Sequence, residues 1–313
     1  MTLLAPRPAL DAAGEARAGV GYGVAAYGLW GLFPLFWPLL EPAGAVEILA
    51  HRIVWSLVVV AGVLALTRNL GFLRGMPGRS RVVMLLGAAA IVIAINWGVY
   101  IYGVNSGHVV ETSLGYFINP IVTVLLGVFF LGERLRGLQW VALGCVALAV
   151  TLLTLQYGQP PWLAFVLATS FATYALLKKK ARVGAVESLA VETAVLAPLA
   201  LTYLLVLAAR GDATFTSEGV GHTVLLASCG VVTAIPLILF GAAATRVPLT
   251  TLGLLQYLAP TLQFFTGVVI YGEPMPAARL ACFGLVWLGL AIFTTDALRH
   301  RRSKQLALSV EAM

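Results

Sequence analysis

The stretch ETSLGYFINPIVTVLLGVFFLGER, Glu111–Arg134, recurs in related form 140 residues later as TTLGLLQYLAPTLQFFTGVVIYGEP, Thr250–Pro274. At this offset Pro120 falls opposite Pro260, and the Gly-Glu pair near the end of one stretch falls opposite that of the other. Each stretch is apolar over about the 20 residues that a transmembrane helix needs. Repetition at one fixed offset indicates a chain built from two related, membrane-embedded halves.

Composition places the whole chain in a membrane, because 60% of its residues are hydrophobic and 11% are charged, against roughly 25% charged in soluble domains. The apolar runs are continuous rather than alternating, which predicts α-helices and not barrel strands. We expect ten spans. They are 18–39, 46–66, 82–102, 109–131 and 138–155, then 162–177, 188–208, 223–243, 250–271 and 277–297.

The predicted fold class is therefore an all-α membrane protein with two halves of five helices each. An odd number of spans per half inverts the second half relative to the first, as in many secondary transporters. The predicted limits are a tail at 1–17, a first repeat at 18–156, a second repeat at 157–297 and a basic tail at 298–313. Close helix packing is expected at small residues, namely Gly127, Gly144, Gly267 and Gly284.

Basic residues predict the orientation of the spans, because Lys and Arg are enriched in cytoplasmic loops. Most of the 20 Lys and Arg residues fall in the two tails and in every second loop. Both termini are therefore predicted to be cytoplasmic, and Lys178–Arg182 is interpreted as a topology signal at the lipid surface. The net charge of +7 does not indicate a nucleic-acid partner, because it is spread over many segments.

Ionisable groups within spans cost about 2.5 to 3.5 kcal/mol each on insertion scales, so they need a partner or a role. The segment VEILAHRIVWS places Glu47 and His51 on one face of the second span, with Arg52 about 100° further round. We predict a local contact between Glu47 and His51. Arg52 falls opposite Glu192 at the repeat offset, and we expect these charges to pair, holding the halves together and re-forming as a carrier changes sides. The alternative is that Arg52 is a purely structural counter-ion.

Histidine titrates with an ordinary pKa of about 6.5, which makes His51 a candidate proton-coupling residue. The alternative for His51 is a hydrogen-bonded structural role. Glu111 opens the fourth span, where a carboxylate is favoured by the helix dipole, so it is interpreted as an anchor. The pairs Gly132-Glu133 and Gly272-Glu273 are interpreted as helix terminations.

Several stretches resemble the RarD branch of the EamA drug/metabolite transporter superfamily, over about Gly19 to Asp296. They are YGLWGLFPLFW, EILAHRIVWS, NWGVYIYGVN, AATR, YGEP and the two repeated stretches quoted above. The resemblance implies a ten-span carrier of two inverted EamA repeats in the bacterial cytoplasmic (inner) membrane, and it favours efflux. Members of the branch are commonly named chloramphenicol-sensitivity proteins, a name that describes a phenotype and identifies no native substrate.

Carriers with inverted repeats bind their substrates near the bilayer midplane, at helices interrupted by Gly or Pro. Spans four and nine are predicted to break at Pro120 and Pro260, since proline removes a helix hydrogen bond. Amides in hydrocarbon need a partner or water, whereas a single aromatic residue is equally explained by packing. The predicted substrate-binding residues, which would line one amphipathic cavity, are Trp30, Asn96, Tyr100, Tyr116, Asn119, Tyr174, Gln256 and Tyr257.

The predicted function is secondary active export of small amphipathic metabolites or drugs, with protons as the candidate coupling ion. Import or exchange by the same fold is the alternative. No metal and no cofactor are expected, since the three cysteines lie within spans and show no ligand spacing. An intramembrane enzyme is disfavoured because the sequence has no GxSxG elbow and no HExxH motif, and a channel because it shows no ring of like residues.

Overall fold

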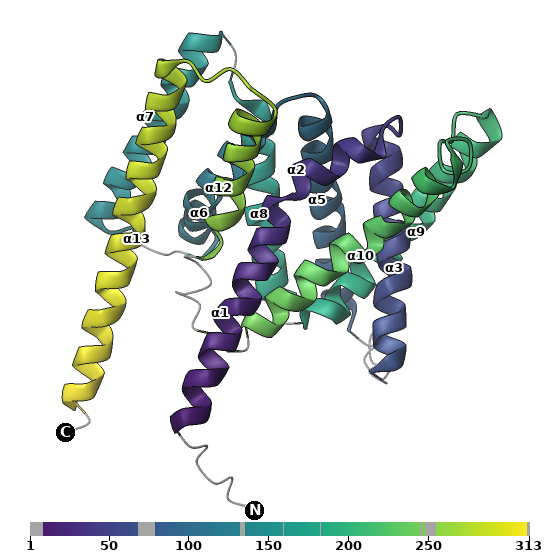
Figure 1. The fold of residues 1–313 in the computed structure, drawn as a ribbon. Helices are drawn as coiled ribbons and strands as arrows, with labels where there is room; N and C mark the ends of the chain where they lie inside the picture. The colour runs from purple at the N-terminus through teal and green to yellow at the C-terminus, as the bar shows by residue number, and fades with distance from the viewer. Residues whose placement is uncertain are drawn as a thin grey trace, which may run out of the picture. The chain divides into compact units, whose positions relative to one another are not determined.

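The computed structural model describes residues 9–67, 79–131, 135–158, 160–181, 183–244, 246–247 and 255–311. In these ranges the regular structure is entirely helical and contains no β-strand (Figure 1). This confirms the all-helical membrane class predicted from the continuous apolar runs.

Most helices lie within a few residues of a predicted span. The α-helices, labelled as in Figure 1, are α1 (Ala9–Gly31), α2 (Phe33–Phe36), α3 (Ala45–Leu66), α5 (Ser80–Asn105), α6 (Val109–Leu131), α7 (Gly137–Tyr157), α8 (Trp162–Ala181), α9 (Ala185–Arg210), α10 (Gly219–Ala244), α12 (Leu258–Phe265) and α13 (Ala277–Glu311). A short 3-10 helix, η1 (Trp37–Leu40), follows α2, and a π-helix, η2 (Thr266–Ile270), follows α12.

Seven of the described helices are long and apolar enough to cross a membrane: α3, α5, α6, α7, α9, α10 and α13. An eighth span results if Gly14–Gly31 and Phe33–Leu40, which meet at a bend of 43°, are counted together. Two further apolar helices, Trp162–Lys178 and Leu258–Ile270, are shorter. They coincide with the predicted sixth and ninth spans, so ten full spans stay a prediction.

Both tails are more helical than the sequence prediction assumed. Helix α1 begins at Ala9, inside the predicted tail 1–17, and α13 continues to Glu311, well beyond the predicted limit at 297. Ala, Glu, Leu, Lys and Arg dominate these extensions and have high helix propensity. A helix that leaves the apolar region therefore continues where its sequence still favours helix.

The helices form two compact units, each assembled from both ends of the chain. Unit 1 comprises Met1–Gly78 and Val183–Leu262, and unit 2 comprises Arg79–Arg182 and Gln263–Met313. In unit 1, α1 packs on α10, and α3 packs on both α9 and α10. In unit 2, α8 packs on α5 and α6, and α7 packs on α13. The predicted repeats, 18–156 and 157–297, therefore cross the packing units instead of coinciding with them.

Glycines allow three of these helix pairs to approach closely. A Cβ on Gly230 of α10 would overlap the Trp55 backbone of α3, and one on Gly115 of α6 would lie 2.9 Å from the Ala164 carbonyl of α8. Gly289 of α13 meets α7 in the same way, with its hypothetical Cβ 2.9 Å from the Ala142 carbonyl oxygen. Close contact at small residues thus favours helix association in lipid, where the hydrophobic effect between helices is weak.

The glycines predicted to allow close helix packing differ in their surroundings. Gly267 is confirmed, because a Cβ there would lie 2.7 Å from Val110 Cγ2. Gly144 and Gly284 were predicted wrongly, since no described residue lies within 4 Å of a Cβ at either position. The side chain of position 127 lies outside the described residues.

Pro120 does not end its span as predicted, whereas Pro260 lies directly after a turn at Gln256 and Tyr257 that interrupts the ninth span. Pro120 lies within α6, which continues to Leu131, and Pro260 is the third residue of α12. Proline is tolerated in the first turn because the backbone N–H groups there have no helical acceptor. Gly272 does end a helix as predicted, with φ of +63° after η2, whereas Gly132-Glu133 lies outside the described residues.

Candidate functional site

The ionisable residues predicted in the second span are buried within unit 1. Glu47, His51 and Arg52 of α3 are 3%, 5% and 3% exposed, and Glu192 of α9 is 1% exposed. They are buried because α9 and α10 both pack against α3. These four ionisable side chains therefore lie buried in a largely apolar bundle, where each needs compensation.

Arg52 connects α3 to three neighbouring elements, α10, α2 and η1. Its Nε donates a hydrogen bond of 3.0 Å to Thr233 Oγ1 of α10. Its guanidinium carbon lies 5.0 Å from the ring centroid of Trp37 and 5.7 Å from that of Phe33. Cation–π contacts of this kind stabilise a desolvated guanidinium by about 2 kcal/mol. Arg52 is thus a packing element as well as a charge, and its pairing with Glu192 stays a prediction.

The predicted local contact between Glu47 and His51 is wrong. Glu47 Oε1 instead accepts a hydrogen bond of 2.8 Å from the backbone N–H of Thr214, in the connection between α9 and α10. The His51 ring stacks on Phe215 of the same connection, with centroids 4.6 Å apart and planes inclined by 19°. A neighbouring loop, which helix spacing alone does not show, provides the partners for both residues.

Two of the predicted substrate-binding residues of unit 2, Asn96 and Tyr116, lie together. Asn96 Nδ2 donates to the Leu167 carbonyl at 3.0 Å and to Ser170 Oγ at 2.9 Å, both on α8. Asn96 Oδ1 accepts from Tyr116 Oη of α6 at 3.1 Å. Asn96 is 1% exposed and all its polar atoms have protein partners, so it holds α5, α6 and α8 together.

An aromatic row continues from this amide and includes two more predicted residues. Tyr100 meets Tyr116 edge to face with ring centroids 5.6 Å apart, Tyr116 meets Phe171 at 6.0 Å, and Phe171 meets Tyr174 at 6.1 Å. Lys178 Nζ lies 5.2 Å from the centroid of Tyr174. Tyr116, Phe171 and Tyr174 are half-buried, so their faces remain partly available to a ligand.

Asn119 differs from Asn96 in its hydrogen bonding. It is 8% exposed, and its Oδ1 is buried without a hydrogen-bond partner among the described residues. A buried amide oxygen without a partner costs about 1 to 3 kcal/mol. Of the predicted amides in unit 2, Asn119 is therefore the one whose acceptor would gain from a substrate or water.

The remaining predicted residues belong to unit 1. Trp30 lies 5.3 Å from Tyr27 and 5.8 Å from Phe240, between ring centroids, and packs against a buried cluster with Leu255 and Leu258. Gln256 and Tyr257 form the half-buried turn before α12. Their chain neighbours Leu255 and Leu258 pack, like Trp30, against this buried cluster.

Two carboxylates cap helices of unit 2, and both were predicted from the sequence to have structural roles. Glu111 Oε1 accepts the N–H of Leu163 at the start of α8 at 3.0 Å, in agreement with its predicted anchoring role. Glu273 accepts the N–H groups of Val109 and Val110 at the start of α6. Burial raises the pKa of the Glu273 carboxyl, although these two N–H groups act in the opposite direction. The second cap was not predictable from the sequence, because its partner is more than 160 residues away.

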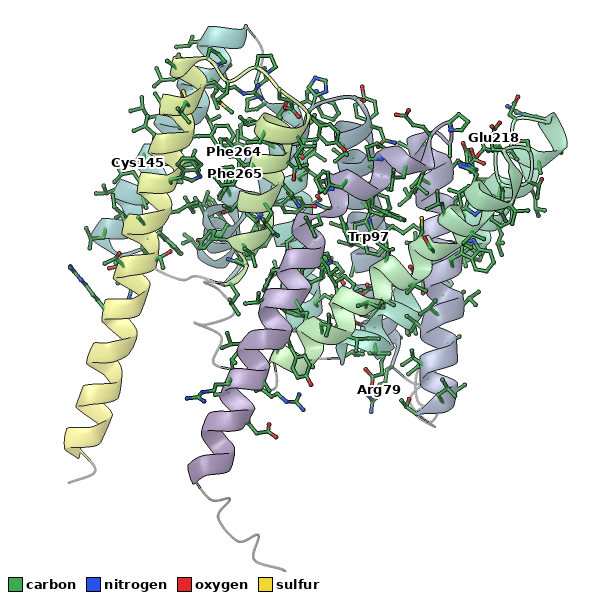
Figure 2. The ribbon with its side chains drawn as sticks, in the orientation of Figure 1. Arg79, Trp97, Cys145, Glu218, Phe264 and Phe265 are labelled. Carbon is green, nitrogen blue, oxygen red and sulfur yellow. The ribbon has the colours of Figure 1, made fainter. Side chains whose placement is uncertain are left out.

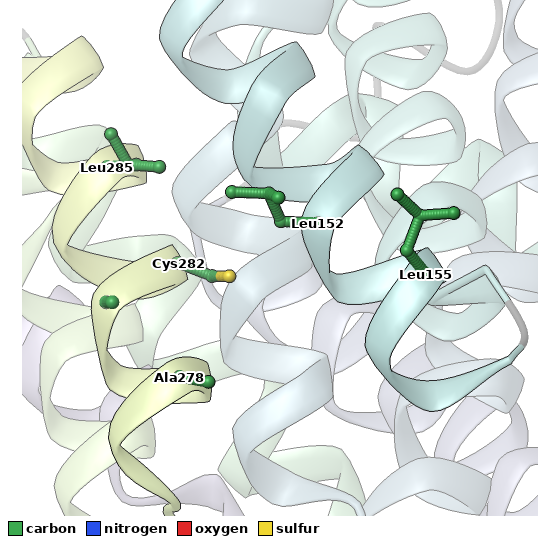
Figure 3. Close-up of a pocket in the computed structure, with 6 residues that line it drawn as sticks. Leu152, Leu155, Ala278, Cys282 and Leu285 are labelled. Atoms are coloured by element: carbon green, nitrogen blue, oxygen red, sulfur yellow. The ribbon is translucent and has the colours of Figure 1, made fainter.

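Two hollows lie on unit 2, and neither contains a predicted site residue. The larger has a volume of about 430 Å³ and an apolar lining from α7 and α13 (Figure 3). The smaller measures about 10 Å³. The larger is lined by Leu152, Leu155, Ala278, Ala281, Cys282 and Leu285. Within the described residues, no group of three or more His, Cys, Asp or Glu side chains is placed to hold a metal ion.

Comparisons with known proteins agree with this helical, membrane-embedded chain. Residues 17–155 match the EamA-like transporter family. Protein RarD of Streptomyces exfoliatus is 56% identical over 97% of this chain and 96% of its own length. The uncharacterized transporter YojE of Bacillus subtilis (strain 168) is 41% identical over 93% of this chain and 98% of its own. Protein RarD of Escherichia coli (strain K12) is 38% identical over 92% and 97%.

The likeness extends to three-dimensional structure. A crystal structure of another protein aligns with a TM-score of 0.59 over 90% of this chain and 98% of its own, at 20% identity. That level of identity speaks for the fold alone. The sequence relationships are much closer and run nearly end to end, so this chain belongs to the EamA-like transporter family, as a RarD-type member, and is a membrane transporter.

Proposed function

We propose that this protein is a secondary active exporter of small amphipathic metabolites or drugs, working by alternating access in the bacterial inner membrane. Its architecture in this proposal is ten spans in two inverted five-helix repeats, with both termini in the cytoplasm. Membership of a transporter family supports the general class, and the arrangement of helix pairs supports the mechanism.

The observation that carries the mechanism is that helices pack across the predicted repeats in a twofold pattern. Exchanging the repeats turns the pair α1 and α10 into the pair α8 and α5, and both pairs are present. The same exchange maps α3 and α9 onto each other, and likewise α7 and α13, and both of these pairs are also present. The pairs of α3 with α10 and of α6 with α8 have no counterpart of similar extent among the described residues, so the twofold relation is partial. Pairs that survive exchange of the halves are what two-fold related repeats produce, and such repeats can rock around a shared site.

In this proposal, the binding residues of unit 2 offer the substrate one polar atom among aromatic rings. Asn119 Oδ1 is a buried acceptor awaiting a donor, and the half-buried rings of Tyr116 and Tyr174 offer apolar faces. Trp30, Gln256 and Tyr257 of unit 1 stay predicted substrate-binding residues. This chemistry suits a small molecule with hydrogen-bond donors on an apolar body.

The test starts by finding a substrate. Medium and cells are compared by metabolomics with and without overexpression, and each enriched compound is then assayed for counterflow with the purified protein in proteoliposomes. We expect saturable counterflow that falls about tenfold in Asn119→Ala, as loss of one hydrogen bond predicts. Asn105→Ala at the end of α5 is the matched control. Flux without saturation or counterflow would overturn the proposal, and accumulation in the direction of uptake would replace export by import.

A further inference from the structure

The connection between α9 and α10 folds over the first turns of α3 and is fastened to them. The Thr214 N–H donates to Glu47, and the Phe215 ring lies on His51 and also 6.1 Å from the ring of Trp55. Thr223 Oγ1 donates to the Phe215 carbonyl, which holds the connection against α10. Glu218, labelled in Figure 2, lies exposed at the end of this connection.

Under this connection, His51 lacks the hydrogen bonds that a buried imidazole needs. His51 is 5% exposed, and neither of its ring nitrogens has a hydrogen-bond partner among the described residues. A neutral imidazole offers one donor and one acceptor, so two capacities are unused. Buried polar groups without partners are rare in native proteins and call for a ligand, a bound water or a functional reason.

The charges around His51 are mixed. Glu47 and Arg52 lie on its own helix, α9 contributes Glu192 and Tyr203, and α10 contributes His222 and Cys229. The connection itself carries Asp212 and Glu218, which are both exposed. His222 Nε2 lies 2.9 Å from Thr214 Oγ1, so a second imidazole contacts the connection. Carboxylates favour an imidazolium, whereas Arg52 and His222 disfavour it.

We propose that His51 is a proton-binding site closed by Phe215. The Phe215 ring covers one face of the imidazole and excludes water, and opening of the connection admits water, which carries the proton to an unpartnered ring nitrogen. In this step a hydronium ion loses one O–H bond and becomes water, while the ring gains one N–H bond and one positive charge. Its use as the coupling step rests on the proposed transport function, whereas the gated site itself does not.

The test measures access to His51 without any substrate. A neutral imidazole nitrogen attacks a carbonyl carbon of diethyl pyrocarbonate and becomes carbethoxylated, with release of ethanol and carbon dioxide. The reaction requires solvent access, and the chain has only 4 histidines. Rates at individual histidines are followed by mass spectrometry in lipid nanodiscs. We expect slow modification of His51 in the unaltered protein and a rate about tenfold higher in Phe215→Ala, since the variant loses a stacked aromatic contact.

Controls separate gating from a general loss of structure. Phe265→Ala removes a ring of the same size that is 54% exposed in unit 2 and is expected to leave the His51 rate unchanged. The exposed His108 serves as an internal reference, with equal rates in all variants. Phe215→Leu keeps apolar bulk and is expected to give an intermediate rate. An unchanged His51 rate in Phe215→Ala would overturn the gate.

A second measurement tests the proton. In Phe215→Ala, the His51 ¹⁵N ring resonances, identified by their absence in His51→Gln, are expected to shift between pH 8 and pH 5. Resonances that stay fixed over this range would overturn the proton site. Failed counterflow together with a reactive, titrating His51 would refute the transport proposal alone, whereas counterflow with an insensitive His51 would refute this inference alone.

Discussion

Arg52 shows how a single charge is accommodated in an apolar bundle. Thr233 accepts one of its hydrogen bonds and the rings of Trp37 and Phe33 cover its guanidinium. The sequence predicted that Arg52 lies in a span and needs compensation, because a charge there is costly. It did not predict Thr233 or the rings, because a threonine 181 residues away carries no sequence mark of this role.

The pairing of Arg52 with Glu192 is testable by a double-mutant cycle. Both are buried on α3 and α9, which pack together. Removing one member of a buried pair costs about 3 to 5 kcal/mol, whereas replacing both is far less damaging. We therefore expect Arg52→Gln and Glu192→Gln each to lower the unfolding temperature in detergent, and the double variant to recover part of the loss. Strictly additive losses would exclude pairing.

Asn96 and Asn119 were equivalent candidates in the sequence, and their contacts now separate them. Every polar atom of Asn96 has a protein partner, whereas Asn119 Oδ1 has none among the described residues. Asn96→Leu is expected to lose about 1 to 3 kcal/mol of stability, as expected when partners are left unsatisfied. Asn119→Leu is expected to cost clearly less. Chemical unfolding in detergent measures both, and an Asn96→Leu variant as stable as the parent would contradict the structural role.

At the scale of helices, the apolar pattern predicted well where helices begin and end, but it predicted poorly where a helix breaks. Predicted span 46–66 agrees with α3 (Ala45–Leu66) because hydropathy marks where a helix meets polar loops. The break predicted at Pro120 did not occur, since α6 continues through it. Proline removes one hydrogen bond, but neighbouring helices keep a membrane helix intact around it. Whether a helix breaks at a proline depends on packing contacts, which a single sequence does not show.

Close helix approach makes a sharp prediction at Gly230. A Cβ there would overlap the Trp55 backbone, whereas nothing lies within 4 Å of one at Gly62 of α3. Alanine is intrinsically the better helix former by about 1 kcal/mol. We expect Gly62→Ala to keep or raise the unfolding temperature and Gly230→Ala to lose about 1 to 3 kcal/mol through forced separation of α3 and α10. Equal unfolding temperatures for the two variants would show that this contact is not tight.

At the scale of the whole molecule, sequence repeat and packing unit are different divisions of the chain. The repeat follows from residues that recur at one offset, whereas the units follow from which helices touch. Four helix pairs show this: α1 with α10, α3 with α9, α5 with α8, and α7 with α13. Each pair joins one helix from before residue 158 to one from after it. Neither half of the sequence therefore contains the partners that its own helices need.

This arrangement predicts the behaviour of a chain divided after Gly158, in the turn between α7 and α8. Expressed alone, fragments 1–158 and 159–313 each leave the packing faces of their helices exposed to lipid, and such unpaired membrane helices lack their stabilising contacts. We expect each fragment alone to reach a level at least about tenfold lower than the coexpressed pair, measured by immunoblot of membranes. Coexpressed fragments should co-purify in detergent, because the crossing pairs re-form without a covalent link. A single fragment that accumulates and purifies as a monodisperse species would instead mean that each repeat folds by itself, and that the crossed pairs only dock two finished halves.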